Sequence, residues 1–147
     1  MEIQPEYRTY IQKDTDVRRA ALVARQYAQA CGFSVLEQWR IATIAAELSS
    51  NLCKHVGEGV LILRPLGREK QIHGLVISTR DRGPFIGDPK QAFSDGYSKG
   101  RMWQPQEGDD CPESLGVGLG TVKRMSDRVI INITKAGGTV VVVMVKK

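Results

Sequence analysis

The alternation of apolar and polar residues in the first third of the chain predicts one strand and two helices. Tyr7–Ile11 alternates loosely and is rich in β-forming residues, as a strand is. A helical repeat follows from Asp14 or Thr15 to Ala30, and Gly32 supplies its stop. The second helix is expected from Ser34 to about Val56, with Gly57 at its end. It opens with a capping box, in which the serine hydroxyl and a glutamate three residues later satisfy each other's free backbone amides.

The rest of the chain predicts two pairs of strands, separated by helices and one long loop. Gly96–Ser114 is polar, rich in glycine, proline and aspartate, and has no usable period, so we expect a long loop there. Long loops inside compact domains are usually lids, binding segments or disordered. The other expected elements are strands at Val60–Leu63 and Ile72–Thr79 with a turn at Leu66–Lys70, a short helix capped by Asp88 before Pro89, a helix at Gly118–Ser126, and strands at Val129–Thr134 and Thr139–Val145 joined by a Gly137–Gly138 turn. This order predicts an α+β fold, a two-layer α/β sandwich with helices on one face of a mixed, mostly antiparallel sheet.

The composition is that of an ordinary globular domain. The chain has 147 residues, of which 41% are hydrophobic and 25% charged, and this fits a single domain over residues 1–147 with its own core. No apolar run approaches the roughly 20 residues of a membrane helix, and the polar N-terminus does not resemble a secretion signal. Three cysteines without metal-binding spacing are expected to be reduced thiols. We therefore expect a cytoplasmic protein with no membrane partner.

The net charge is +5, with a pI near 9.3, which raises the question of nucleic-acid binding. Lysines and arginines are scattered along the chain, and their only pure clusters are pairs. No RNA-binding aromatic motif or zinc-finger spacing accompanies them. The sequence therefore predicts no nucleic-acid partner, and the surplus positive charge suits a nucleotide site or an acidic protein partner.

The second predicted helix carries two stripes of side chains, at about 100° per residue. The apolar stripe predicts the core contact and consists of Ile41, Ala45, Leu48, Leu52 and Val56. The polar stripe lies on another side and consists of Arg40, Thr43, Glu47, Asn51 and Lys54. A solvated helix face would explain the polar stripe. Asparagine is a mediocre helix former, however, and this favours a cleft-lining role for Asn51.

Two further segments have the chemistry of a binding site. An apolar strand ends at Asp81, and Gly83 and Pro84 follow it, although an ordinary turn would explain this segment alone. Glycines alternate at positions 116, 118 and 120 before a helical pattern, so backbone amides and a helix N-terminus can approach a phosphate there. A Rossmann motif requires a preceding strand and a Walker motif requires Gly-Lys-Ser/Thr, and the sequence provides neither.

Together and in this order, the three segments resemble the N, G1 and G2 boxes of the GHKL ATPase superfamily, which includes gyrase, heat-shock protein 90, histidine kinases and MutL. The resembling stretches are Glu47-Leu-Ser-Ser-Asn51-Leu-Cys-Lys54-His55, Asp81-Arg-Gly83-Pro-Phe-Ile86 and Gly116-Val-Gly118-Leu-Gly120. Gly137-Gly138-Thr139 is similar to the family's closing Gly-Thr element. The resemblance covers nearly all of the chain from about Asp14.

Within the superfamily, the chain is most similar to the single-domain anti-sigma regulatory kinases, especially the RsbT-like switch kinases. This likeness is carried by Arg40-Ile-Ala-Thr43, Ala46-Glu47-Leu48 and Gly118-Leu-Gly-Thr-Val-Lys-Arg124. The resemblance implies the Bergerat fold and a serine/threonine kinase that uses ATP and Mg²⁺. The implied substrate is a STAS-domain, anti-anti-sigma-like protein in a bacterial partner-switching pathway, with a phosphatase or sigma-regulatory protein downstream.

The resemblance also implies roles for individual residues. Glu47 would be the general base and Asn51 would ligate Mg²⁺. Asp81 would accept a hydrogen bond from the adenine amino group, with Thr139 and a water assisting. A mobile ATP lid is expected at about residues 96–115. The other expected nucleotide contacts are Lys54, Gly83, Ile86, Ser98, Lys99, Gly116, Val117, Gly118, Leu119, Gly120 and Thr121.

The chain departs from the family pattern at two places. Phe85 stands where the G1 box usually has a second glycine, and a bulky side chain there would crowd the adenine pocket. The lid has an insertion that contains Trp103, either a partner anchor or an ordinary loop tryptophan. Two other functions stay open: an anti-sigma factor that mainly sequesters a sigma factor, and a nucleotide-dependent binding switch with weak catalysis. Glu47 favours an active kinase, because a pure binder needs no base. His55 and His73 lack metal-ligand spacing and are interpreted as structural.

Overall fold

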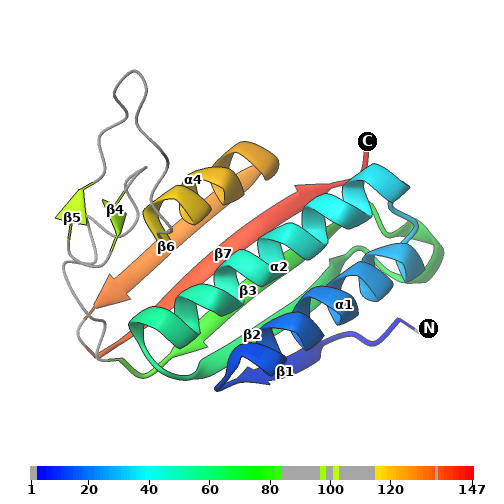
Figure 1. Ribbon diagram of the computed structural model, residues 1–147. Coiled ribbons are helices and arrows are strands. Elements are labelled where there is room, and N and C mark those ends of the chain that lie inside the picture. Colours follow the sequence, from blue (N-terminus) through cyan, green and yellow to red (C-terminus); the bar gives the residue numbers. More distant parts are fainter. Residues whose placement is uncertain (1–2, 84–96, 99–100, 103–114, 135) are drawn as a thin grey trace.

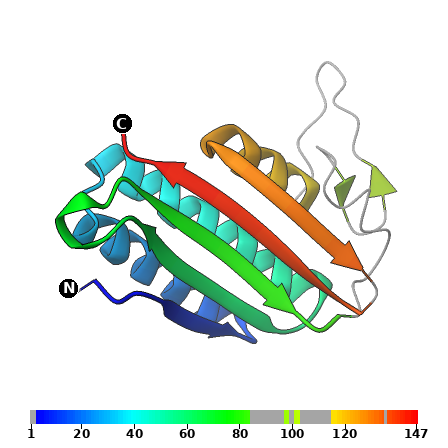
Figure 2. The ribbon, with the colours of Figure 1, turned by 180° about the vertical axis from the view of Figure 1, so that it is seen from behind.

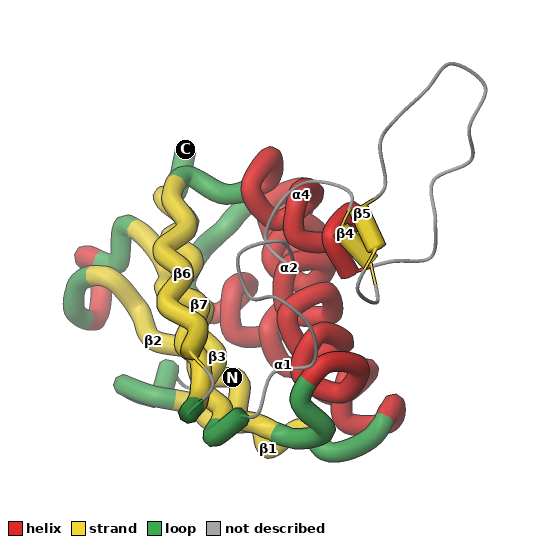
Figure 3. The backbone as a smooth tube through the Cα atoms, turned by 90° about the vertical axis from the view of Figure 1, so that its left-hand side faces the viewer, coloured by secondary structure: helices red, strands yellow, loops and turns green. Residues whose placement is uncertain are grey.

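Helices cover one face of a five-stranded sheet, and the two layers are separate in the side view of Figure 3. Figure 1 shows the computed structural model, which describes residues 3–83, 97–98, 101–102, 115–134 and 136–147. The strand order in the sheet is β1-β2-β3-β7-β6. These strands are β1 (Tyr7–Ile11), β2 (Gly59–Leu66), β3 (Gly74–Asp81), β6 (Arg128–Thr134) and β7 (Gly137–Val145).

The helical layer consists of α1 (Asp14–Ala30), α2 (Val35–His55) and α4 (Leu115–Met125). A 3₁₀ turn, η1 (Glu69–Gln71), connects β2 to β3, and a two-stranded sheet pairs β4 (Tyr97–Ser98) with β5 (Arg101–Met102). The predicted two-layer α+β architecture is therefore confirmed.

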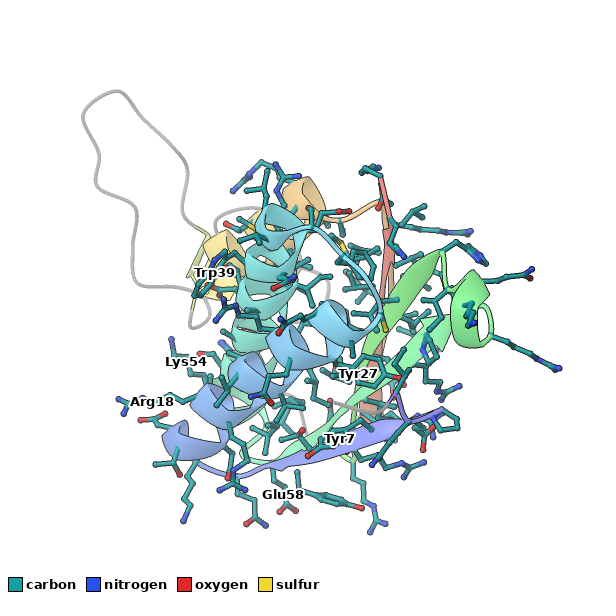
Figure 4. All side chains as sticks on the ribbon, turned by 90° about the vertical axis from the view of Figure 1, so that its right-hand side faces the viewer. Tyr7, Arg18, Tyr27, Trp39, Lys54 and Glu58 are labelled. Carbon is teal, nitrogen blue, oxygen red and sulfur yellow. The ribbon has the colours of Figure 1, made fainter. Side chains whose placement is uncertain are left out.

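The core lies between the helices and the sheet. Ile41 and Leu48 of α2 are buried there, together with Leu63 and Ile77 of the central strands. Full burial of each such side chain contributes roughly 1.5–3 kcal/mol. Tyr27 of α1 lies between the layers (Figure 4), and its hydroxyl donates a hydrogen bond to the carbonyl of Gln4. Burial, with the nearby Cys31 thiol, raises the pKa of Tyr27 to about 12.

The predicted start and stop signals of α2 are confirmed. The Glu37 amide donates to Ser34 Oγ at 3.2 Å, and the Ser34 amide donates to Glu37 Oε1 at 3.2 Å, which completes the capping box. At the other end Gly57 has a positive φ of 104°, a conformation that glycine adopts at low cost. The apolar stripe also packs as predicted, because Ile41, Ala45, Leu48 and Leu52 are all buried.

Several strand boundaries differ from the prediction because pairing decides them. β3 was expected at Ile72–Thr79 but begins and ends two residues later, since Gly74 pairs with both Leu66 and Val145 and Asp81 pairs with Gly138. β2 likewise extends on both sides of the expected Val60–Leu63. Every strand pair in the described sheet is antiparallel, so the expectation of a mixed sheet is corrected. The short β4–β5 pair lies where only loop was expected.

The structure describes two of the three cysteines and most of the predicted helices. Cys31 and Cys53 are free thiols, and burial raises the pKa of Cys31 to about 11. No helix in the described part of the chain has the length and apolar character to cross a membrane. Cys111, Trp103 and the short helix expected after Asp88 lie outside the described residues.

Candidate functional site

The helices and strands that carry the described site residues meet at one end of the molecule (Figure 1). The C-terminal end of α2, the N-terminal end of α4, the last residues of β3 and the first residues of β7 all lie there (Figure 1). Gly59 shows how closely α2 approaches the sheet. A Cβ at this position would lie 2.7 Å from Leu52 Cδ2 of α2 and 2.8 Å from the carbonyl oxygen of Arg80 in β3. The Asn51–Leu52 turn of α2 therefore sits over the end of β3.

Asn51 is the most unusual residue of this end. Its side chain is buried, with 9% exposure, and neither amide atom, Oδ1 or Nδ2, has a hydrogen-bond partner in the described structure. A buried polar group left unsatisfied costs about 1–3 kcal/mol. Such a group persists where a ligand completes it. Its burial distinguishes Asn51 from a residue of a solvated helix face.

The other polar residues of the α2 stripe differ from Asn51 in exposure. Glu47 lies one helical turn earlier and is half-buried, so its carboxylate retains access to solvent. Lys54 is exposed and projects from the helical layer on the side away from the sheet (Figure 4). Asn51 and Glu47 therefore share the edge of the site, whereas Lys54 lies outside it in this conformation.

Asp81 is the last residue of β3 and is held in a defined orientation. Its Oδ1 accepts a hydrogen bond of 2.7 Å from the Gly83 amide, so that the side chain closes a local turn. Gly83 has a positive φ of 63°, which this turn requires and which glycine adopts readily. The hydrogen bond from the Gly83 amide is the one that orients the Asp81 carboxylate among the described residues.

Two glycines of β7 leave room beside Asp81. Gly138 pairs directly with Asp81, so its missing side chain would otherwise occupy the same face of the sheet. Gly137 passes even closer, because a Cβ there would lie 2.5 Å from the Asp81 carbonyl oxygen. Glycines at both positions therefore let β7 pass close to the end of β3.

Gly137→Ala is expected to destabilise the protein by about 2–3 kcal/mol, since the new Cβ would displace the Asp81 backbone in addition to straining a positive φ. Gly57→Ala is the matched control, because Gly57 also has a positive φ but no atom lies within 4 Å of its Cβ position. The control should cost only about 1 kcal/mol. Urea unfolding of both variants measures the difference, and equal losses would contradict the close approach.

The strand register does not bring Thr139 together with Asp81. Thr139 pairs with Arg80, and Asp81 pairs with Gly138. Directly paired residues share a face and successive residues alternate, so Thr139 and Asp81 lie on opposite faces of the sheet. The predicted assistance of Asp81 by Thr139 stays a prediction that this register does not favour. The sequence analysis missed Thr79, which is buried with 3% exposure on the same face as Asp81, two residues earlier.

The glycine segment lies inside a helix. The helix was expected to begin at Gly118, but α4 begins at Leu115, so positions 116, 118 and 120 fall in its first turns. The first four amides of a helix lack internal partners and carry partial positive charge. Leu119 and Val122 are buried where α4 packs on α2. The Thr121 hydroxyl accepts a hydrogen bond of 3.2 Å from Arg124 Nη2.

Several residues that were predicted to contact the nucleotide are described only by their backbone or not at all. Ile86, Lys99 and Phe85 lie outside the described residues, as does most of the expected lid. The backbone of Ser98 belongs to β4, which lies beside α4. The backbones of Gly116, Val117 and Gly118 belong to the first turns of α4.

The donor set at this end suits one metal in particular. Among the described residues, no group of three histidine, cysteine, aspartate or glutamate side chains could hold a metal ion. The two histidines lie in different environments, because His55 is buried and His73 is exposed. Mg²⁺ needs few protein ligands, because it keeps several waters and takes its remaining oxygens from substrate phosphates. A single orphaned amide oxygen, such as Asn51 Oδ1, fits this mode of binding.

Comparison with known proteins decides the family. The model of the histidine kinase-like ATPase domain matches residues 12–146. The chain belongs to this family. The predicted resemblance to the GHKL superfamily, which the sequence motifs suggested, is thereby confirmed.

Two relatives refine the comparison of this histidine kinase-like ATPase domain. It is 30% identical over 129 residues to the serine/threonine-protein kinase RsbT of Bacillus subtilis (strain 168), covering 88% of this chain and 87% of that protein. Its fold is similar to the crystal structure of the RsbU and RsbW domains of a Mycobacterium tuberculosis protein, with a TM-score of 0.63 and 13% identity. That match covers 97% of this chain and 33% of the other, so the chain spans about a third of that structure. The family implies use of ATP, and the likeness to RsbT supports kinase activity.

Proposed function

We propose that this histidine kinase-like ATPase domain is an ATP-dependent protein serine/threonine kinase. The observation that carries the proposal is the buried Asn51 amide without a protein partner, one helical turn from the half-buried Glu47 and over the strand end that holds Asp81. Phosphoryl transfer from a nucleotide needs three groups of this kind: a metal ligand, a solvent-accessible carboxylate and an oriented hydrogen-bond acceptor.

Asp81 is proposed to read the adenine ring. Its Oδ1 is engaged by the Gly83 amide, and Oδ2 would accept a hydrogen bond from the adenine amino group. Guanine has a carbonyl oxygen in place of that amino group, so it would face the carboxylate with a repulsive acceptor. Gly138, which has no side chain, pairs with Asp81 on the same side of the sheet.

Asp81→Asn is expected to weaken ATP binding by about tenfold or more, because a charged hydrogen bond worth about 1.5–3 kcal/mol is replaced by an amide that can present a donor. Isothermal titration with ADP and Mg²⁺ measures this loss. Asp127→Asn is the matched control. Asp127 directly precedes β6, and its carboxylate forms an ion pair with Lys147 at 2.7 Å. Unchanged affinity in the Asp81 variant would remove it from the adenine site.

The phosphates are proposed to lie between α2 and the start of α4. The free amides of the first turn of α4 would donate to phosphate oxygens, which is the usual use of a helix N-terminus. Asn51 Oδ1 would be the protein ligand of Mg²⁺, and the metal when bound would neutralise the phosphate charge. The exposed Lys54 would add a positive charge on reorienting toward the phosphates.

Glu47 is proposed as the general base. The substrate hydroxyl would transfer its proton to the Glu47 carboxylate as its oxygen bonds to the γ-phosphorus. The bond from the γ-phosphorus to the bridging oxygen breaks at the same time, and ADP leaves with that electron pair. For this transfer the hydroxyl must come within about 3 Å of the carboxylate.

The proposed substrate is a serine or threonine of a STAS-domain protein, as the similarity to RsbT suggests. The partner-switching setting, a downstream phosphatase or sigma-regulatory protein, a cytoplasmic location and the absence of a nucleic-acid partner belong to the same proposal. Phosphorylation would add about two negative charges to the docked surface and thereby change the affinity of the complex.

The test mixes the chain with γ-labelled ATP, Mg²⁺ and purified STAS-domain proteins, and mass spectrometry locates any phosphate. We expect phosphate on a serine or threonine of one STAS protein, in complexes that dissociate after transfer. Tight binding to a sigma factor without transfer to any STAS protein would favour an anti-sigma factor. ATP binding without any transfer would favour a binding switch.

A further inference from the structure

Among the described residues, no helix or strand covers the face of the sheet opposite the helices, and this uncovered face has an unusual composition. In Figure 2 the five strands face the viewer, and no described helix or strand lies in front of them. An antiparallel sheet with one solvated face normally alternates apolar and polar residues. β7 does not alternate, because every residue from Val140 to Val145 is apolar. An apolar run of this kind is typical of a strand that is buried on both faces.

The register shows which residues form this uncovered face. Val141 and Val143 of β7 alternate with the buried Val140 and Val142, so they point away from the helices. Val76 pairs with Val143, and Ile130 pairs with Val141, so both lie on the same face. Ile130 is 47% exposed, and Tyr10, at the far edge on β1, is 69% exposed. We call the solvent-accessible apolar residues of this face the valine patch, and its members are Val60, Val76, Ile130, Val141, Val143 and Val145. Ile62 lies on the same face but is fully buried, with 0% exposure.

Arginines lie beside the valine patch. Arg8 pairs with Ile62, Arg64 pairs with Val76, and Arg128 pairs with Val143, so all three lie on the uncovered face. Arg80 lies on this face as well, beside Thr139. All four side chains are exposed. The uncovered face therefore presents an apolar patch beside four exposed arginines.

One carboxylate faces these arginines. Glu6 pairs with Arg8 at 2.7 Å and with Arg64 at 3.1 Å. The hydrogen bond from Arg8 is the main cause that lowers the pKa of Glu6, and the charges of Arg8, Arg64 and Arg80 add to it. No described residue forms an ion pair with Arg80 or Arg128, so the positive charge of this face exceeds its negative charge among the described residues.

We propose that the uncovered face of the sheet binds an acidic protein surface, with the valine patch at the centre of the interface and the arginines around its rim. This inference does not depend on the proposed kinase activity, since the face lies opposite the helical layer and the Glu47–Asn51 edge. Five strands that are spaced about 4.8 Å apart and are about seven residues long have a face with an area of roughly 500 Å². An area of this size can form the centre of a standard interface, which buries about 800 Å² per partner.

Charge selects this occupant over the others. A second copy would place the same arginines against one another, and like charges across an interface are unfavourable. A nucleic acid would gain from the arginines but not from an apolar centre, because its outer surface is phosphate and sugar. An acidic protein with apolar residues in its centre complements both parts of the face.

The experiment places a photoreactive phenylalanine analogue at the position of Ile130 in the full chain and, as a matched control, at Leu22, which is 55% exposed on α1 in the other layer. After irradiation in the native host, mass spectrometry identifies the adduct and the cross-linked peptide. The identified protein is then purified and titrated against the chain. We expect an adduct specific to position 130, with aspartates or glutamates in its cross-linked peptide.

The affinity measured in the titration should depend on residues of the uncovered face and not on residues of the helical layer. Arg128→Glu and Ile130→Asp are each expected to weaken binding by at least about tenfold, and Leu22→Asp by less than about twofold. Circular dichroism and thermal unfolding confirm that the variants fold, as substitution of exposed side chains predicts. Raising the salt concentration from about 50 to about 500 mM should weaken binding to the acidic surface.

Several results would overturn the inference. An adduct at position 130 with a second copy of the chain, together with a dimer mass in light scattering that Ile130→Asp abolishes, would assign the face to self-association. Binding of anionic phosphatidylglycerol vesicles or duplex DNA that is lost in Arg128→Glu would assign it to a membrane or a nucleic acid. Adducts no stronger at position 130 than at position 22, or binding that charge reversal leaves unchanged, would remove the site.

Discussion

Replacing Glu47 by glutamine is expected to lower the rate of phosphoryl transfer at least about a hundredfold while changing nucleotide affinity by less than about threefold. A positioned general base typically contributes a factor of about 10²–10⁴, and glutamine keeps the shape of the side chain but cannot accept the proton. Because Glu47 is half-buried and lies one turn from Asn51, the variant should fold normally and retain the nucleotide. Single-turnover transfer to a STAS-domain substrate and titration with ADP measure the two effects separately.

Glu58→Gln is the matched control for this experiment. Glu58 is exposed beyond the end of α2, where its carboxylate accepts a hydrogen bond from Gln12 at 3.4 Å. It has the same chemistry as Glu47 but no place in the proposed site, so transfer should continue at the normal rate. Transfer at the normal rate in Glu47→Gln would exclude Glu47 as the base and would leave the nucleotide-binding part of the proposal intact.

Asn51→Leu is expected to have two effects of opposite sign. Without nucleotide, the variant should be more stable by about 1 kcal/mol or more, because a buried amide with two unpartnered atoms is replaced by an apolar side chain of similar size. In a domain of this size that gain corresponds to a rise of about 2–4 °C in Tm. With ATP and Mg²⁺, the stabilisation seen in the unmodified protein should disappear, since the metal loses its protein ligand. A ligand at about 100 times its Kd normally adds about 2.7 kcal/mol.

Thermal unfolding with and without ATP, repeated with and without Mg²⁺, measures both effects of Asn51→Leu. Asn132→Leu is the control, because Asn132 is exposed on β6 and should change neither quantity. A loss of stability in the nucleotide-free Asn51 variant would show that protein groups satisfy the amide. Magnesium-dependent stabilisation that persists in the variant would exclude Asn51 as the metal ligand.

Interactions between near neighbours in the chain determine much of the fold. The capping box at Ser34, the apolar stripe of α2 and the stop at Gly57 depend on residues within a few positions of one another, and all three are confirmed. The three motif segments were recognised for the same reason, because each is a short run with a fixed spacing. Family membership followed from their order along the chain and is confirmed by the match over residues 12–146.

The sequence could not decide which face of the sheet Thr139 occupies. β7 is apolar on both faces from Val140 onward, so no alternation in the sequence marks the side that meets the helices. Only its pairing with β3 fixes the register, in which Gly138 meets Asp81 and Thr139 turns away. A shift of one residue would reverse both faces, and that choice is made by strands distant in the sequence.

The same limitation applies to the end of β3 and to the start of α4. β3 reaches Asp81 because Gly138 pairs with it. α4 begins at Leu115, which is earlier than the low helix propensity of its glycines suggests, and the helix packs on α2. The unsatisfied Asn51 amide and the uncovered face with its arginines are likewise properties of the assembled layers. The sequence by itself therefore determined the elements, the motifs and the family, since these depend on neighbouring residues. Tertiary structure alone decided the facing and the burial of the site residues, because both depend on contacts between segments far apart in the chain.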